Sequence, residues 1–299
     1  MTIERHAFHL DAGDGLVAPI DGVVHAPPPR YDGRRAAVLI AHGFKGFMDW
    51  GFFPALADLL AERGFVAVRF NFPGSGMRPG DALVTDLDAF RDTTFLRERD
   101  EILAMLDRLR ASALPLANRT DAARIGLVGH SRGGGTAVLA AASDAGRDAL
   151  RALVTWNAVG TFQRFPEAVR DRWREDGQLP VQNGRTGQTT FLGLNLLDEI
   201  ENEAEALDLD AAAARRTAPW LIVHGSEDAT VPVDEAHRLY AAASGDGDGD
   251  GDDAAAAAAL EVIAGSGHTF EAKHPFACPT PALIHAMNHT QRWLRRHLA

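Results

Sequence analysis

The segment Gly129-His130-Ser131-Arg132-Gly133 constrains the fold of this chain more than any other, because it places a serine between two glycines where the structure is expected to change. The apolar run 124–128 before it predicts a short buried strand, and the Ala-rich run 136–143 after it predicts a helix. A serine on so sharp a turn has a strained backbone, and a side chain two residues to either side would collide with the strand or the helix. The pattern therefore predicts an exposed hydroxyl group at the end of a strand, beside a helix N-terminus.

The two groups that would activate such a hydroxyl follow later in the chain. A serine becomes an effective nucleophile when an imidazole removes its proton and a carboxylate holds that imidazole. Asp228 comes shortly after the apolar run 220–225, and His268 lies in the loop after the apolar run 260–263. Because each residue follows a predicted strand, we expect Ser131, Asp228 and His268 to meet at the carboxyl edge of one sheet.

Other residues remain candidates for the acid and the base. Glu227 is the nearby alternative to Asp228 as the acid. The chain has 12 histidines, and His274 is the main alternative to His268 as the base. Three more histidines lie in or beside predicted strands, where we expect them to hold loops or the core by hydrogen bonds: His42, His130 and His224.

A further loop completes the predicted site. His42-Gly43-Phe44 follows the apolar run 36–41, and a loop in this position commonly supplies one backbone N–H to an oxyanion hole. The second N–H comes from the residue after the nucleophile, so the predicted donors are the amides of Phe44 and Arg132. Phe47 and Trp50 follow in the same loop. They either line an apolar pocket for an acyl or aryl group or pack beneath the segment that covers the site.

These motifs together resemble the α/β-hydrolase superfamily. Within it, the similarity is to dienelactone-hydrolase-like and prolyl-oligopeptidase-like serine hydrolases, including feruloyl and acyl esterases, and it extends from about residue 4 to residue 297. The resemblance implies an α/β fold with a mostly parallel twisted sheet, helices on both faces and a cap insertion. Dienelactone hydrolases proper use a cysteine nucleophile, whereas this chain has Ser131. That difference favours ester or amide cleavage over the lactone reaction.

The implied activity is hydrolysis of carboxylic esters of small or medium acyl or aryl substrates through an acyl-enzyme, with no cofactor. Peptidase, amidase or acyltransferase chemistry with the same three residues remains an alternative. A non-catalytic relative that binds a small ligand is another, because one fold serves many functions. The natural substrate and the oligomeric state are not predicted by the sequence.

Composition narrows the class of protein. A chain of 299 residues that is 46% hydrophobic is sufficient for one α/β domain over residues 1–299. The single cysteine, Cys278, excludes an intramolecular disulfide, and no long apolar segment predicts a signal peptide or a membrane span, so a cytoplasmic location is expected. The net charge of −11 opposes binding to nucleic acid or to anionic membranes. The sequence contains nothing that resembles a Cys/His cluster or an HExxH helix, so no metal site is expected.

Two segments interrupt the alternation of strands and helices. Residues 157–217 predict a cap or lid beside the site, with a helix over 196–214. Residues 244–259 alternate Asp and Gly before a run of alanines, and they predict a flexible linker. The Asp-Gly run imitates the first half of a calcium-binding loop, but its twelfth position is alanine, so no calcium site is expected. Earlier in the chain, two antiparallel strands are predicted over 4–10 and 16–25, and one helix over 86–110.

Overall fold

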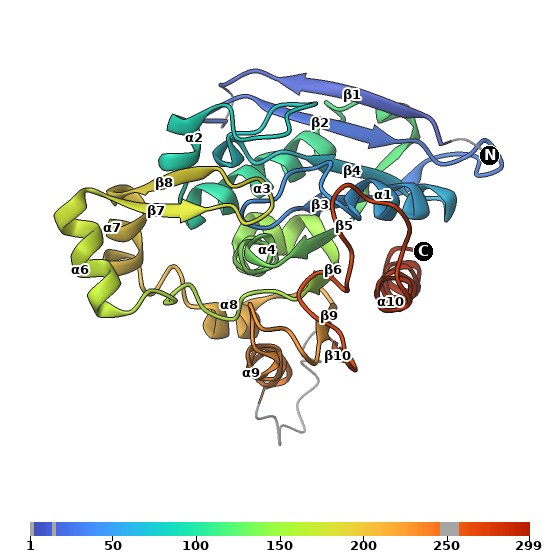
Figure 1. Ribbon diagram of the computed structural model, residues 1–299. Helices are drawn as coiled ribbons and strands as arrows, with labels where there is room; N and C mark the ends of the chain where they lie inside the picture. The colour runs from blue at the N-terminus through green and yellow to red at the C-terminus, as the bar shows by residue number, and fades with distance from the viewer. Residues whose placement is uncertain (1–2, 14–15, 246–256) are drawn as a thin grey trace.

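The protein is built around one eight-stranded sheet, seen in a computed structural model that describes residues 3–13, 16–245 and 257–299 (Figure 1). The strand order is β1-β2-β4-β3-β5-β6-β9-β10. The strand β2 is antiparallel to both of its neighbours, and all the other pairs are parallel. The strands are β1 Arg5–Leu10, β2 Ile20–His25, β3 Arg35–Ala41, β4 Val66–Phe70, β5 Thr120–His130, β6 Leu150–Trp156, β9 Trp220–Gly225 and β10 Ala258–Ile263.

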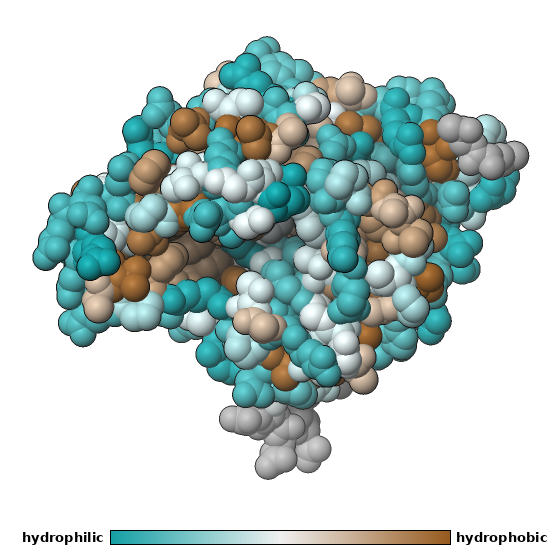
Figure 2. All heavy atoms as spheres, viewed as in Figure 1, coloured by the Kyte–Doolittle hydropathy of each residue, from teal (hydrophilic) through white to brown (hydrophobic). Residues whose placement is uncertain are grey.

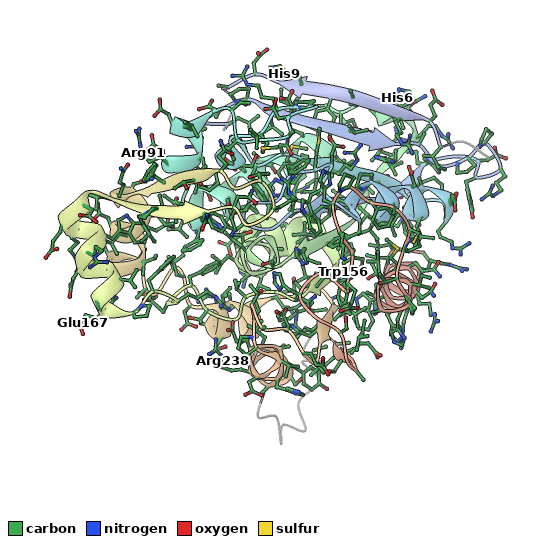
Figure 3. The ribbon with its side chains drawn as sticks, in the orientation of Figure 1. His6, His9, Arg91, Trp156, Glu167 and Arg238 are labelled. Atoms are coloured by element: carbon green, nitrogen blue, oxygen red, sulfur yellow. The ribbon has the colours of Figure 1, made fainter. Side chains whose placement is uncertain are left out.

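Helices cover both faces of the sheet, as the apolar composition of its central strands requires. Along β3, Leu39 packs into the apolar core on one face, while Val38 and Ile40 pack into the core on the other. The helices α1 and α10 lie on the Val38 face. Trp156, labelled in Figure 3, joins β6 to α10, because its Nε1 donates to Thr290 Oγ1 at 2.8 Å. The helices of the two faces are α1 Phe53–Glu62 and α10 Pro281–Leu298, opposite α3 Phe95–Arg110, α4 Arg132–Ala142, α8 Leu209–Arg215 and α9 Val233–Ser244; short helices are α2 Leu87–Arg91, α5 Asp144–Ala149, η1 Pro73–Ser75 and η2 Ala117–Arg119.

The region 86–110 forms two helices, α2 and α3, where the sequence predicted one. The side chain of Asp86 accepts a hydrogen bond from the N–H of Ala89, and that of Thr94 accepts one from the N–H of Arg97. Each is an N-cap, and the second cap starts a new helix within a continuous apolar pattern. The second predicted strand is also shorter than expected, because it begins at Ile20 and not at residue 16.

The insertion between β6 and β9 forms a projecting lobe and one helix that lies beside the sheet. The lobe, which we call the cap, covers residues 167–202 and lies at the left of Figure 1. The predicted helix over 196–214 is divided, because Asp208 caps α8 through the N–H groups of Asp210 and Ala211. The helix α8 packs against α4 and α9, so it belongs to the helical layer. The cap consists of α6 Glu167–Asp176, the antiparallel hairpin β7 Gln178–Gln182 and β8 Thr189–Gly193, and α7 Leu194–Asn202.

Most of the predicted linker 244–259 lies outside the described residues. Its last residues are in the sheet, since β10 begins at Ala258, which pairs with Trp220. The strand therefore starts two residues earlier than the sequence indicated. Within the ranges that the structure describes, no helix is long and apolar enough to cross a membrane.

Candidate active site

Ser131 lies on the turn between β5 and α4, and its backbone has φ +57°. The two flanking glycines are required by their surroundings. A Cβ on Gly129 would lie 2.4 Å from the carbonyl oxygen of Gly133, and a Cβ on Gly133 would lie 2.1 Å from the carbonyl oxygen of His42. Any other residue at either position would therefore displace the turn that presents the serine.

The structure brings the three predicted residues together in one hydrogen-bonded series. His268 Nε2 lies 2.9 Å from Ser131 Oγ, and His268 Nδ1 lies 2.7 Å from Asp228 Oδ2. The serine follows β5, the aspartate follows β9 and the histidine follows β10, so the three loops meet at the carboxyl edge of the sheet. An imidazole in this position can take the proton of the hydroxyl while the carboxylate stabilises its cationic form.

Asp228 is buried and held in its ionised form. Its Oδ1 accepts hydrogen bonds from the N–H groups of Thr230, at 2.8 Å, and Val231, at 2.9 Å. Burial alone would raise the pKa of this carboxyl group, but the hydrogen bonds from His268 and the two amides outweigh it, so the pKa is below its ordinary value. Glu227, the alternative acid, is exposed, and the carboxylate that contacts His268 is that of Asp228.

Two buried histidines flank the serine, and each is held by a hydrogen bond to a backbone carbonyl oxygen. His42 bonds through Nδ1 to the carbonyl oxygen of Gly43 at 3.0 Å, and its Nε2 accepts from the N–H of Phe72 at 3.1 Å. His130 Nε2 donates to the carbonyl oxygen of His268 at 3.0 Å. Burial lowers the pKa of His42 to about 4 and that of His130 to about 3, so both rings are neutral at physiological pH.

The two other candidate histidines have structural partners. His224 is fully buried in β9 and lies 2.9 Å from the carbonyl oxygen of Val231 through Nε2. His274 Nδ1 accepts from the N–H of Gly51 at 3.1 Å, and its ring stacks on Trp50. Of the histidines considered for the base, His268 is the one that the structure bonds to Ser131.

The two predicted oxyanion donors lie beside the serine. The loop after β3 approaches so closely that a Cβ on Gly43 would be 2.8 Å from Ser131 Cβ. In the described part of the chain, the N–H groups of Phe44 and Arg132 donate to no protein acceptor. The Arg132 side chain is held by Glu98, which accepts from its Nε at 2.9 Å, and it lies over the ring of Phe95. The two amides therefore remain available to a ligand.

Two cavities open on either side of Ser131. The larger, of about 370 Å³, lies between the sheet and the cap, and Figure 2 shows an apolar recess in this region. The smaller, of about 270 Å³, includes Trp50. Phe47 lines neither cavity, and its buried ring packs against that of His274 with centroids 5.2 Å apart, so packing is the alternative that the structure favours for this residue. The larger cavity is lined by Phe44, Lys45, Phe95, Ser131, Arg132, Val159, Phe162, Arg164, Phe165, Leu192, Leu196, Thr230, Val231 and His268.

Sequence reasoning missed Asn157, which positions the histidine loop. Asn157 Nδ2 donates to the carbonyl oxygen of His268 at 2.8 Å, and its Oδ1 accepts from the N–H of Gly225 at 2.8 Å. It lies just after β6 with φ +46°, a left-handed conformation that asparagine tolerates better than most residues. An asparagine directly after a buried strand was the available signal.

Glu199 is a second residue, after Asn157, that the sequence did not single out. It attaches the cap to α3. Glu199 on α7 accepts hydrogen bonds from the N–H groups of Phe95, at 2.7 Å, and Leu96, at 3.2 Å. These are the first N–H groups of α3, which have no partner within their own helix, and the helix dipole favours an anion there. The contact fixes the cap over the larger cavity.

Comparison with known proteins identifies the class. A family model described as the alpha/beta hydrolase family matches residues 37–281, which include Ser131, Asp228 and His268. The chain therefore belongs to the α/β-hydrolase family, and its relatives include esterases and peptidases. The bis(hydroxyethyl) terephthalate hydrolase of Streptomyces coelicolor is 31% identical over 139 residues, which is 46% of this chain and 38% of that protein.

Solved structures share the fold at low identity. Est1E from Butyrivibrio proteoclasticus, with ferulic acid bound, has a TM-score of 0.66 at 20% identity over 95% of this chain and 97% of that one. The acylaminoacyl peptidase of Pyrococcus horikoshii has a TM-score of 0.67 at 18% identity, covering 100% of this chain and 42% of that one. Each likeness covers nearly the whole of this chain.

Proposed function

We propose that this hydrolase is a serine esterase that cleaves carboxylic esters of small or medium acyl or aryl groups through an acyl-enzyme. The observation that carries the proposal is the hydrogen-bonded series Asp228–His268–Ser131, which opens into an apolar cavity. Two unused backbone N–H groups beside the serine support it, because ester cleavage passes through an oxyanion that needs such donors.

The first half of the reaction forms the acyl-enzyme. His268 Nε2 takes the proton of Ser131 Oγ as that oxygen attacks the ester carbonyl carbon, and Asp228 holds the imidazole tautomer and stabilises the imidazolium. The carbonyl oxygen becomes negative and is held by the N–H groups of Phe44 and Arg132, each such donor being worth about 3–4 kcal/mol. His268 then gives its proton to the leaving alcohol as the ester bond breaks.

The second half releases the acid. A water molecule takes the place of the alcohol, and His268 removes its proton as the water oxygen attacks the acyl carbon. The second oxyanion is held by the same N–H groups. When it collapses, the bond to Ser131 Oγ breaks and the proton on His268 returns to the serine. Protein side chains and water are sufficient for these steps.

The cavity favours an apolar acyl group, including an aromatic one. The rings of Phe95 and Phe162 stack with centroids 4.1 Å apart, and Phe165 and Leu196 add to the same wall. A volume of about 370 Å³ lies in the usual range for small-ligand sites. The terephthalate ester in the name of the Streptomyces relative and the ferulic acid bound to Est1E both contain an aromatic acid, which agrees with this wall.

A matched panel of substrates tests the proposal. We expect turnover of p-nitrophenyl esters with kcat/KM highest at medium acyl length, turnover of methyl ferulate, and little turnover of aminoacyl p-nitroanilides. Rapid cleavage of the anilides with slow cleavage of every ester would replace the esterase by a peptidase or amidase. Transfer of the acyl group to an added alcohol in preference to water would indicate an acyltransferase.

A covalent probe tests the nucleophile separately. A fluorophosphonate forms a stable bond to an activated serine, so the wild-type protein should gain one label at Ser131, located by peptide mass spectrometry. The Ser131→Ala variant should gain none. Absence of labelling in the folded wild-type protein would support the non-catalytic, ligand-binding alternative.

A further inference from the structure

Two histidines of α10 and one glutamate of β10 meet at the edge of the sheet, away from the catalytic serine. His285 and His289 are four residues apart, so they lie on the same face of the helix, one turn from each other. Glu261 belongs to the edge strand β10. The sequence shows only the spacing of the two histidines, and the glutamate comes from another element. For that reason no metal site was expected here.

The three side chains converge on one point. His285 Nε2 lies 2.8 Å from Glu261 Oε1, and His289 Nδ1 lies 3.5 Å from Glu261 Oε2. The two imidazole rings stack almost in parallel, with centroids 4.5 Å apart and planes at 9°. One ligand atom from each of the three residues lies within 4.8 Å of the others, and the side chains are 28% to 47% exposed.

We propose that Glu261, His285 and His289 bind a divalent transition-metal ion of the Zn²⁺ or Ni²⁺ type. Zinc takes imidazole nitrogens and carboxylate oxygens at about 2.0–2.2 Å, and four-coordinate ligands are then roughly 3.3–3.6 Å apart. The spacings in this cluster are close enough that changes in side-chain rotamers bring the three atoms to that geometry. Solvent exposure gives the ion access and leaves room for water at the remaining position. Two imidazoles and one carboxylate suit zinc and nickel better than calcium or magnesium.

The charge state of the cluster is compatible with binding. Partial burial lowers the pKa of His289, and the neighbouring His285 and Arg292 lower it further, although Glu261 opposes them. A neutral imidazole is the form that binds a metal. Arg292, one turn further along α10, carries a positive charge that repels a bound cation. The net charge of −11 on the whole protein attracts the cation.

The place of the cluster in the fold gives the bound ion a consequence. The segment 264–280 leaves β10, carries His268 to the serine and enters α10. An ion held by Glu261 at one end and by His285 and His289 at the other joins the two ends of this segment. It therefore stabilises the folded loop by reducing the conformational freedom of the chain that it closes.

Titration of metal-free protein with ZnCl₂ tests the proposal, using protein purified without a histidine tag and a Cys278→Ser background to remove the exposed thiol. We expect one Zn²⁺ per chain by calorimetry, and a melting temperature that rises by about 5 °C at a hundredfold excess over the dissociation constant. Co²⁺ in place of Zn²⁺ should give the visible absorption of a four-coordinate site. Binding should weaken as the pH falls, because protons compete with the metal ion for the imidazole nitrogens.

Variants locate the ion. His285→Gln and Glu261→Gln should each weaken Zn²⁺ binding at least tenfold and abolish the rise in melting temperature, and both should leave basal hydrolysis unchanged. His237→Gln, which alters an exposed histidine on α9, is the matched control and should bind as the parent does. Equal binding by all the variants, or no binding by the parent, would overturn the proposal and leave a hydrogen-bonded surface cluster. Neither result depends on whether the protein is an esterase.

Discussion

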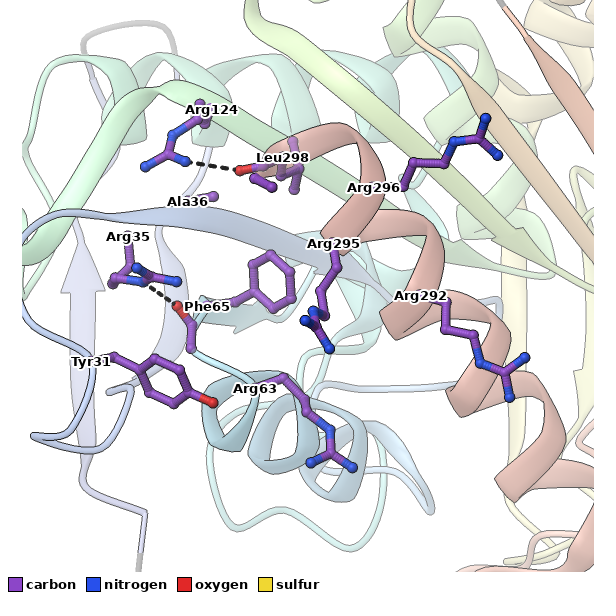
Figure 4. Close-up of a pocket in the computed structure, with 12 residues that line it drawn as sticks. Tyr31, Arg35, Ala36, Arg63, Phe65, Arg124, Arg292, Arg295, Arg296 and Leu298 are labelled. Carbon is purple, nitrogen blue, oxygen red and sulfur yellow. Dashed lines mark hydrogen bonds between the residues drawn. The ribbon is translucent and has the colours of Figure 1, made fainter.

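Two hollows lie at opposite ends of strand β5. They differ in volume and in whether the arginines that line them are paired with carboxylates. Ser131 follows the end of β5 and faces the cap cavity of about 370 Å³. Arg124, in the first half of the same strand, lines a hollow of about 600 Å³ at the other end of the sheet (Figure 4). The larger hollow is lined by six arginines: Arg35, Arg63, Arg124, Arg292, Arg295 and Arg296.

Beside Ser131, the arginines are paired with carboxylates. Glu98 accepts from Arg132 Nε at 2.9 Å, and Glu235 lies 2.5 Å from Arg164 Nη2. These ion pairs neutralise the cations and fix their side chains. Lys45, the other cation in this lining, donates to the carbonyl oxygen of Gln182 at 3.3 Å.

Around the larger hollow, most of the arginines lack such partners. Among the residues that the structure describes, Arg124 alone of the six has a carboxylate within 4 Å, that of Asp121 at 2.7 Å. Arg35 and Arg63 donate instead to neutral oxygens, the carbonyl of Gly64 and the amide of Gln291. The end of the sheet that carries Ser131 is therefore not the one with the larger hollow. What distinguishes that end is a serine bonded to His268, beside arginines that are paired with carboxylates.

The largest expected effect is at the nucleophile. Ser131→Ala and His268→Ala should each lower kcat on a p-nitrophenyl ester by about 10⁵–10⁶-fold, and the double variant should be little slower than either, because the residues act as a unit. Arg295→Gln at the opposite end should keep full activity. Steady-state kinetics on folded, matched preparations provide the measurement. More than a few per cent of residual activity in Ser131→Ala would exclude the serine mechanism.

The next effect separates the two adjacent acids. Asp228→Asn should lower kcat by about 10⁴-fold, because the amide favours the wrong imidazole tautomer and does not stabilise the imidazolium. Glu227→Gln, which changes an exposed neighbour, should leave kcat nearly unchanged. The melting temperatures of both variants serve as the check on folding. If Glu227→Gln were inactive and Asp228→Asn active, the acid would be Glu227.

A smaller effect tests whether the cap cavity holds the acyl group. Leu196 is buried and lines the cavity, so Leu196→Phe should lower kcat/KM for octanoate relative to acetate by about tenfold, a typical value for a change in the fit of an apolar pocket. Leu194→Phe on the same helix changes a residue that is 38% exposed and should preserve the ratio. An unchanged ratio in Leu196→Phe would place the acyl group in the smaller cavity beside Trp50.

The fold and the meeting of Ser131, Asp228 and His268 could be predicted because each depends on a local pattern. Apolar runs followed by Gly, Asp or His residues indicate where parallel strands end, and the glycines around Ser131 indicate the turn. Parallel strands carry those loops to a common edge, so residues distant in sequence could be placed together without knowledge of the side-chain contacts.

The remaining features depend on contacts between elements that are far apart in sequence. Asn157 matters because it joins the His268 loop to β9, and Phe47 packs on His274, which follows it by more than two hundred residues. The cap hairpin has only weak alternation, and its pairing was not predicted. Glu261 becomes a neighbour of two histidines only when α10 docks beside β10.

The smallest expected effect tests the charge balance of the arginine hollow. Replacing both Arg63 and Arg295 by Gln removes two cations without carboxylate partners, so short-range repulsion falls, and the melting temperature should rise by about 1–2 °C at low salt. The net charge of −11 opposes this gain, but it acts from a greater distance and is screened more strongly. In about 0.5 M NaCl the difference should disappear. Arg124→Gln is the matched control, and it should lower the melting temperature because that guanidinium binds Asp121 and the carbonyl of Leu298. If the double variant and the control were destabilised alike, the two ends of the sheet would not differ in charge balance, and the contrast drawn between the hollows would be wrong.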